Sequence, residues 1–192
     1  MFKGIKNNKG VTMIELLGAM VILGMLMGIA VPAISDNIRR NRNQTYVNDA
    51  MKLISNAEYQ FKKDNTIPKP TKTRCILMSL VYLNNGVFDE APNGGEYLKN
   101  QSFVVAINDS SNKTVYYARL IEDMGDGEYR GIDYKTKSDL IKDKSYEYVT
   151  NVSGAKLFKI AGSSNATILG KVDDKVTQCR DIYVYAPNSN DE

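Results

Sequence analysis

One carboxylate stands inside an otherwise uncharged apolar segment near the start of the chain. Residues 11–34 contain a single charged side chain, that of Glu15. An acidic residue in a bilayer-length apolar run costs roughly 2.5–3.5 kcal/mol at mid-membrane and less near its edge, so intramembrane charges tend to have a partner. The nearest candidate partner is the amine that cleavage after Gly10 would create on Val11. The spacing therefore predicts a processed N-terminus that pairs with Glu15.

The residues around this carboxylate follow a specific order. Lys9-Gly10 precedes Val11-Thr12-Met13-Ile14-Glu15, and Pro32 closes the apolar run. This pattern resembles the class III signal of type IV pilins and pseudopilins. The resemblance implies that a membrane peptidase cuts after Gly10 and methylates Val11, and that Glu15 guides assembly. Family members most often have Phe or Met where this chain has Val11.

Length and charge separate three interpretations of residues 11–34. A secretory signal has an apolar core of about 7–15 residues, which is shorter than this run. A plain membrane anchor fits the length, because about 24 residues at ~1.5 Å each span roughly 36 Å, against about 30 Å of hydrocarbon. That interpretation gives Glu15 no role. The prepilin interpretation accounts for the leader, the carboxylate and the length together.

Small residues and a proline interrupt the apolar run. Gly24 and Gly28 form a small-xxx-small pair, which lets helices approach closely in lipid. The alternative, that glycine is simply common in membrane helices, stays open. Pro32 removes one backbone hydrogen bond from a helix. The family resemblance implies that the stretch from about Gly24 to Pro32 unwinds when subunits enter a fibre.

A helical pattern continues beyond the membrane segment. Apolar residues recur at three- and four-residue steps, which marks one buried stripe. They are Val47, Ala50, Met51, Ile54, Ala57 and Phe61, while Asn48, Asp49 and Lys52 fall outside the stripe and are expected to stay hydrated. Pro68 and Pro70 forbid continuation. We expect one helix over residues 12–64, bare in its first half and covered in its second.

The remainder of the chain changes to strand patterns. We expect a short buried helix over residues 75–83, strands over residues 102–107, 114–121, 146–152, 156–160, 167–172 and 181–186, and a helical turn over residues 138–142. A helix followed by strands predicts an α+β fold, in which an antiparallel sheet forms a head against the second half of the long helix. The expected divisions are a leader (1–10), a transmembrane assembly helix (11–34), its amphipathic continuation (35–64), a globular pilin head (65–187) and a loose tail (188–192).

Cys75 and Cys179 are the only cysteines of the chain. A head that faces outward lies in oxidising surroundings, and an even number of cysteines supports one disulfide. Two buried free thiols are the alternative, because buried Cys behaves as a small apolar residue.

An acidic, glycine-rich turn is the one candidate metal site. Residues 122–128 gather four carboxylates, and Asp123, Asp126 and Glu128 could bind calcium through oxygen ligands on a flexible loop. The spacing does not match an EF-hand loop, and a hydrated acidic turn is the commoner arrangement. No other metal and no cofactor is expected.

Enzymatic and nucleic-acid functions find little support. The chain has no His, which removes the usual catalytic triads and most catalytic zinc sites. Loss of Lys3, Lys6 and Lys9 with the leader would leave 22 of the 25 basic residues, which equals the 22 acidic residues. Nucleic-acid binding relies on clustered positive charge, which this composition does not provide.

The resemblance implies a type IV pilin precursor. Such a protein is anchored in the cell membrane with its leader in the cytoplasm and its head outside, and it polymerises with copies of itself into a surface filament for adhesion, motility, aggregation or DNA uptake. The implied partners are the prepilin peptidase, the assembly ATPase, a platform protein and minor pilins. Two alternatives stay open: a minor pilin or pseudopilin of a type II secretion-like system, and a membrane-anchored binding domain with an uncut N-terminus.

Overall fold

The computed structural model describes residues 11–83, 88, 90–99, 101–152, 179 and 181–186. The chain divides into two compact units, Met1–Arg40 and Asn41–Glu192. Residues 11–40 are called the N-terminal segment below, and the described residues from Asn41 onward are called the head unit. The leader, the tail and the expected strands over residues 156–160 and 167–172 lie outside the described residues.

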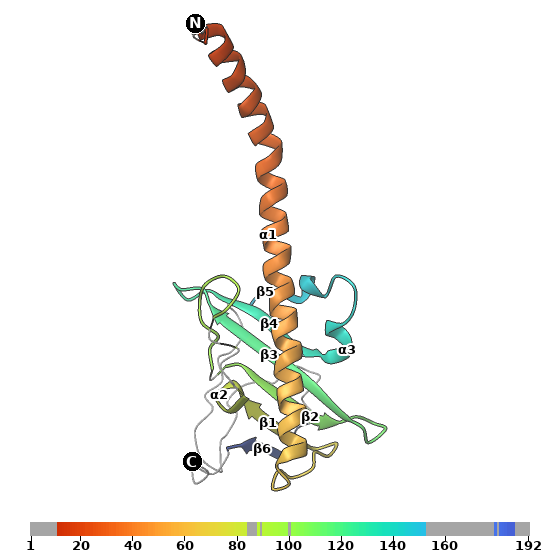
Figure 1. The fold of residues 1–192 in the computed structure, drawn as a ribbon. Helices are drawn as coiled ribbons and strands as arrows, with labels where there is room; N and C mark the ends of the chain where they lie inside the picture. Colours follow the sequence, from red (N-terminus) through yellow and green to blue (C-terminus); the bar gives the residue numbers. More distant parts are fainter. Residues whose placement is uncertain are drawn as a thin grey trace, which may run out of the picture. The chain divides into compact units, whose positions relative to one another are not determined.

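A single long helix runs through both units. Helix α1 spans Met13–Lys63, with 51 residues and Pro32 in its interior (Figure 1). The expected helix over residues 12–64 is confirmed to within one residue at each end. Tyr46, Val47, Ala50, Leu53, Ile54 and Ala57 of this helix are buried in the head unit.

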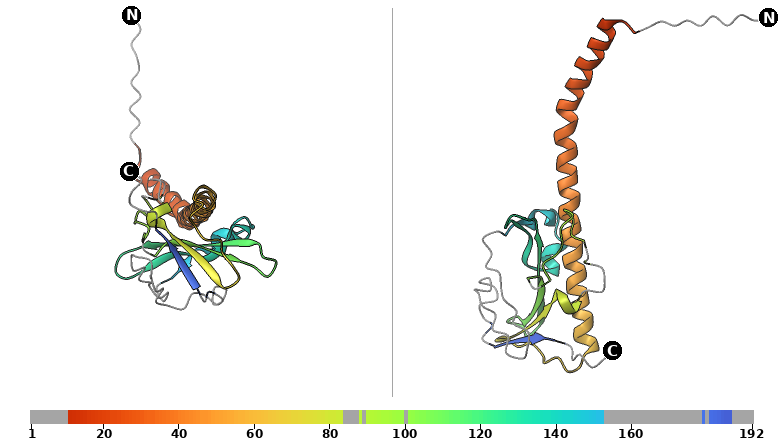
Figure 2. Two further views of the ribbon diagram at one scale, coloured as in Figure 1. Left: turned by 90° about the horizontal axis from the view of Figure 1, so that it is seen from below. Right: turned by 90° about the vertical axis from the view of Figure 1, so that its left-hand side faces the viewer.

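The head unit is built on a six-stranded sheet in the order β5-β4-β3-β2-β1-β6 (Figures 1 and 2). The strands are β1 (Arg74–Ser79), β2 (Phe103–Asn108), β3 (Thr114–Asp123), β4 (Tyr129–Thr136), β5 (Thr150–Asn151) and β6 (Asp181–Tyr185). All neighbours are antiparallel except β1 and β6, which are parallel. Three short helices, α2 (Leu80–Leu83), α3 (Lys137–Leu140) and η1 (Ser145–Tyr148), connect them. The expected α+β architecture is confirmed.

Both faces of the central strands are covered by apolar side chains. Residues such as Ile76, Val104 and Leu120 pack with the buried stripe of α1. Alternate residues, among them Leu77 and Val105, form a second cluster on the opposite face, beside Cys179. Successive side chains of a strand point to opposite faces, so the two clusters together bury nearly all of β1 and β2.

Three local expectations were wrong or incomplete. The helix predicted over residues 75–83 is strand β1 followed by the single turn α2, because a strand buried on both faces shows a continuous apolar run rather than alternation. The strand predicted over residues 146–152 is η1 and the two-residue β5. Strand β4 was not predicted, since its sequence YRGIDYKT is mostly polar.

Candidate functional site

The Glu15 carboxylate is engaged at the start of α1. Its Oε2 accepts hydrogen bonds from the backbone N–H of Thr12 at 2.8 Å and from Thr12 Oγ1 at 2.9 Å. The Glu15 N–H donates back to Thr12 Oγ1 at 3.4 Å. These reciprocal bonds form a capping box, which satisfies backbone donors that the first turn of a helix leaves unpaired. In the uncut chain, Glu15 therefore stabilises its own helix terminus.

The capping box was not predicted, although the sequence carries its signature. Thr12 and Glu15 have the Thr-x-x-Glu spacing directly before an apolar helical run. The expected cleavage site lies beside it. Gly10 is outside the described residues, whereas Val11 is described and its side chain is 73% exposed.

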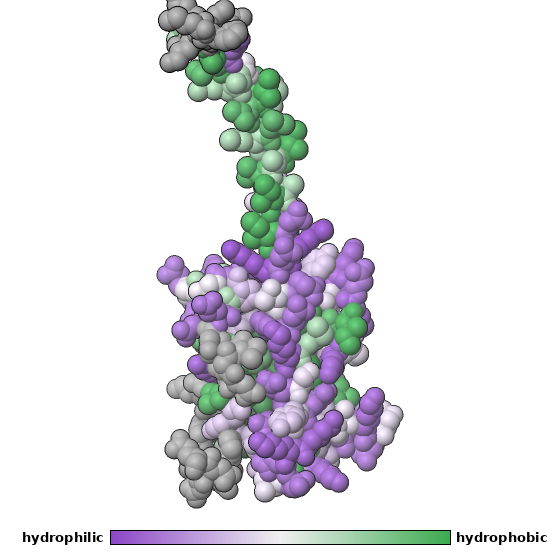
Figure 3. Space-filling model, in the orientation of Figure 1, coloured by the Kyte–Doolittle hydropathy of each residue, from purple (hydrophilic) through white to green (hydrophobic). Residues whose placement is uncertain are grey.

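The N-terminal segment presents apolar side chains that the described residues leave exposed. Apolar residues from Val11 to Ile34 are exposed, including Met13 at 89% and Ile29 at 78%. Figure 3 shows the resulting hydrophobic surface over the first half of α1. Among the described residues, α1 is the one helix long and apolar enough to cross a membrane. So much exposed apolar surface requires a membrane or other protein chains around it.

The glycines of this segment have open space beside them in the described structure. A Cβ atom placed on Gly18, Gly24 or Gly28 would meet no atom within 4 Å. The pair Gly24 and Gly28 therefore leaves space that this chain does not use. Pro32 lies further along the same helix, which continues past it without a break. Roles for Gly24, Gly28 and Pro32 in assembly stay a prediction.

Residues 5–31 match the family described as the prokaryotic N-terminal methylation motif. The chain carries a type IV prepilin signal. The sequence-based interpretation of this segment as a class III signal is confirmed, and Val11 does not prevent the match. Pilins with such signals are structural proteins rather than enzymes. The prepilin signal together with the apolar first half of α1 fits a membrane-anchored precursor. No curated protein and no solved structure matches the chain.

A disulfide joins Cys75 to Cys179, across a sequence separation of 104 residues. Cys75 lies in β1, and Cys179 lies just before β6. The bond thereby fastens the last strand of the sheet to the first. Arg74 and Asp181 add an ion pair between the same two strands, with 2.8 Å between Nε and Oδ2.

The acidic turn between β3 and β4 is organised by its own backbone. Met124 N–H donates to Glu128 O and Glu128 N–H donates to Gly125 O, both at 2.9 Å. Asp123 Oδ1 accepts from the Gly125 N–H at 2.9 Å. Over the part of the chain that the structure describes, no three His, Cys, Asp or Glu side chains gather as a metal site. The calcium candidates Asp123, Asp126 and Glu128 thus do not converge.

A buried polar cluster joins α1 to the sheet. Glu122 of β3 is fully buried, and its two oxygens accept from Gly95 N and Asn93 Nδ2, each at 3.0 Å. Asn93 Nδ2 also donates to Tyr46 Oη at 2.9 Å, and Asn93 Oδ1 accepts from Arg42 Nη1 at 3.3 Å. Asn93 therefore bridges β3 and two positions of α1. Burial raises the pKa of Glu122, although these hydrogen bonds and the nearby arginines partly offset that effect.

A second bridge lies one turn further along the helix. Tyr97 Oη donates to Asp49 Oδ2 at 3.0 Å, and Asp49 is buried rather than hydrated as expected. Burial raises the pKa of Tyr97 far above its ordinary value, and the Asp49 carboxylate adds to the rise. Gly95 is required beside Glu122 of the first bridge, because a Cβ there would lie 2.5 Å from Asp123 O. Sequence reasoning missed both bridges, since their members lie up to 80 positions apart.

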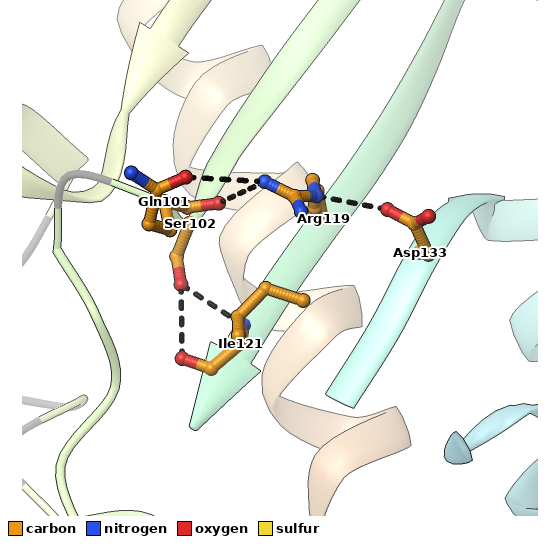
Figure 4. Close-up of polar contacts among 5 residues, drawn as sticks. All are labelled: Gln101, Ser102, Arg119, Ile121 and Asp133. Carbon is orange, nitrogen blue, oxygen red and sulfur yellow. Dashed lines mark hydrogen bonds and ion pairs between the residues drawn. The ribbon is translucent and has the colours of Figure 1, made fainter. Parts of the chain in front are cut away.

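A buried arginine organises the opposite face of the sheet (Figure 4). Arg119 of β3 is 1% exposed, and its Nε donates to Asp133 Oδ1 at 2.9 Å. Its Nη1 donates to the backbone oxygen of Gln101 at 3.2 Å. The Ile121 N–H donates to Ser102 Oγ at 3.0 Å. The segment entering β2 is thereby fastened to β3, so this cluster supports the fold of the head.

Proposed function

We propose that the chain is the precursor of a structural subunit of a type IV pilus. It is cleaved after Gly10, methylated on Val11 and polymerised through the first half of α1 into a surface filament. The prepilin signal at residues 5–31 is the observation that carries this proposal. The precursor lies in the cell membrane with its leader in the cytoplasm and its head outside, and the assembled subunit lies in an extracellular filament.

The difference in burial between the two halves of α1 supports the proposal. The first half has exposed apolar side chains and glycines with open space around them. The second half is buried against a sheet by apolar contacts and by polar bridges such as Asn93 and Tyr97. Polymerisation through the first half would cover the apolar surface and leave the heads outside. Burial of apolar area supplies about 25 cal/mol per Å², so a helix of this kind gains much by being surrounded.

Glu15 has a defined part in this mechanism. In the precursor its carboxylate accepts hydrogen bonds from Thr12. Cleavage places a charged amine on Val11, and in the filament Glu15 pairs with the amine of a neighbouring subunit. A buried charge tolerates few alternative partners, so this pair sets the axial register between subunits.

Partners follow from the same role. A prepilin peptidase processes the precursor, and an assembly ATPase acts through a platform protein to extend the filament. Minor pilins share the machinery. Adhesion, motility, aggregation and DNA uptake are the functions that such a filament serves. A minor pilin or a pseudopilin of a type II secretion-like system is the second candidate, because the same signal occurs in those proteins.

N-terminal mass spectrometry on sheared surface filaments tests the proposal. We expect the chain to begin at Val11, to carry a methyl group on its amine and to be the dominant protein of the filaments. Filaments in which the chain is rare would favour a minor pilin or pseudopilin. A chain that keeps its first ten residues would contradict the proposal.

A further inference from the structure

Two features of opposite chemistry lie at the two ends of strand β4 in the head unit. The acidic turn described above precedes β4, and residues 124–128 are its part between the two strands. The pocket between α1 and residues 140–146, which follow β4, is called the α3 pocket. Strand β4, which separates them along the chain, has 8 residues and is roughly 26 Å long at ~3.3 Å per residue. In Figure 1 the acidic turn lies to the left of α1 and α3 lies to its right.

The acidic turn presents one apolar side chain on a rigid support. Met124 is 42% exposed. Its backbone is fixed by hydrogen bonds to Glu128, and Gly125 and Gly127 adopt φ of 84° and 79°, a conformation that favours glycine. A turn that is already ordered loses little conformational entropy when it binds.

The charges of the acidic turn have no counter-ions in the described structure. Asp126 and Glu128 are exposed, and neither belongs to an ion pair among the described residues. Together with Met124 they form an apolar tip flanked by negative charge.

The α3 pocket combines apolar side chains with two lysines and one aspartate. It has a volume of about 400 Å³, and its lining includes Met51, Leu140 and Ile141 together with Lys142, Asp143 and Lys144. Asp143 Oδ1 accepts a hydrogen bond from the Lys144 N–H at 2.9 Å, which leaves the Lys144 ammonium available to an incoming carboxylate. Ile141 is 69% exposed, more than any other large apolar side chain of the head unit. Lys144 belongs to no ion pair among the described residues, whereas Lys142 Nζ lies 2.8 Å from Asp139 Oδ1. Figure 3 shows the hydrophobic patch on the flank where α3 lies.

We propose that the acidic turn of one subunit docks into the α3 pocket of a second copy of this chain. Met124 enters beside Ile141 and Met51, and Glu128 meets Lys144. Methionine suits such a contact, because its flexible side chain fills irregular apolar space. The inference rests on the proposed function, since the copies meet as subunits of one filament.

The geometry excludes docking of the acidic turn into the α3 pocket of the same chain. The turn and the pocket are separated by the length of β4, so one chain cannot bring them together. A contact between two different patches of identical subunits is heterologous. When its rotation does not close a ring, it generates an open helical filament. The contact between heads therefore repeats from subunit to subunit along the filament, as the packing of the N-terminal segments does.

Disulfide cross-linking tests the contact in assembled filaments. The double variant Met124→Cys with Ile141→Cys is expressed in place of the wild type, and sheared filaments are run without reductant. We expect a ladder of covalent oligomers that reductant collapses to the monomer. The native cysteines are already bonded to each other, so they add no background. The matched control, Met124→Cys with Ser111→Cys at the exposed β2–β3 hairpin, should stay monomeric.

Charge exchange gives a second measurement that needs no new cysteine. Lys144→Glu should lower the amount of filament several-fold, and adding Glu128→Lys to the same chain should restore it. Both positions are exposed, so we expect the head to keep its fold in both variants, which circular dichroism checks.

The outcomes separate this inference from the proposed function. Filaments that form normally but give no ladder, or no response to Lys144→Glu, would overturn the docking contact and leave the pilin proposal standing. A cross-link to a different protein would also overturn it. Absence of the chain from any filament would overturn both proposals.

Discussion

The two halves of helix α1 are made for different surroundings. In the head unit, residues such as Tyr46 and Leu53 are fully buried, and both belong to the apolar cluster that includes residues of the sheet. In the N-terminal segment, residues such as Leu23 and Met25 are 54% and 68% exposed, and the glycines have open space around them. The side chains of the first half are therefore available for contacts outside the chain, and the buried side chains of the second half stabilise the fold. Substitutions in the two halves should accordingly have separable effects.

Removing the disulfide should have the largest effect on the head unit. A loop of about 100 residues closed by a disulfide gains roughly 4–5 kcal/mol from restriction of the unfolded chain. Cys75→Ser with Cys179→Ser should therefore lower the free energy of unfolding by about that amount. Denaturant unfolding of the detergent-solubilised full chain measures it. An unfolding midpoint equal to that of the wild type would contradict the role of the bond.

A pair of leucine substitutions compares the two halves directly. Leu53→Ala removes a fully buried side chain and should cost about 2–5 kcal/mol of unfolding free energy. Leu23→Ala is the matched control, with the same chemical change on an exposed position of the same helix. It should leave the unfolding of the head unchanged. Thermal unfolding in detergent measures the loss for each variant. Equal losses for both variants would contradict the distinction between the two halves.

The Asn93 bridge should have an intermediate effect. Asn93→Ala removes the donor shared by Glu122 and Tyr46 and leaves a buried carboxylate with fewer partners. A buried polar group that loses its partner costs about 1–3 kcal/mol. The unfolding free energy of the full chain measures this loss, with Asn48→Ala on the exposed face of α1 as the control. A loss no larger than that of the control would show that the bridge does not stabilise the head.

The smallest expected effect is the change of folding stability with pH that Glu122 causes. The pKa of Glu122 is raised in the folded protein, so the folded state holds its proton more tightly than the unfolded state does. Stability should therefore decline as pH rises through the range just above the ordinary pKa of glutamate, and this component should vanish in Glu122→Gln. Unfolding midpoints across that range compare the two proteins. Parallel pH profiles would mean that Glu122 does not titrate differently on folding.

The sequence was sufficient where one pattern had one structural meaning. The apolar stripe from Val47 to Ala57 predicted the buried face of α1, and strands β2 and β3 followed from their apolar runs and the polar hairpin between them. The prepilin signal was recognised from Lys9 to Glu15 and was matched as a family motif. These features are local, so a single stretch of sequence contains them.

Other features depend on distant residues and could not be read locally. The apolar run of β1 fits a buried helix as well as a strand covered on both faces, and only its pairing with β2 decides. Asp49 is polar and was expected to be hydrated, but Tyr97, far along the chain, buries it. The carboxylate of Glu122 likewise acquires its environment from Asn93 and Gly95. The capping box of Thr12 and Glu15, in contrast, was visible in the sequence and was overlooked.

The amount of chain in sheared filaments, compared between two variants of Glu15, tests the central claim most directly. Glu15→Gln keeps a side chain that can complete the capping box with Thr12 but removes the charge, whereas Glu15→Val removes both. If the carboxylate pairs with the amine of a neighbouring subunit, both variants should be cleaved after Gly10 and both should be nearly absent from filaments. If Glu15→Gln assembles as well as the wild type, the charge has no role in assembly and the account is contradicted.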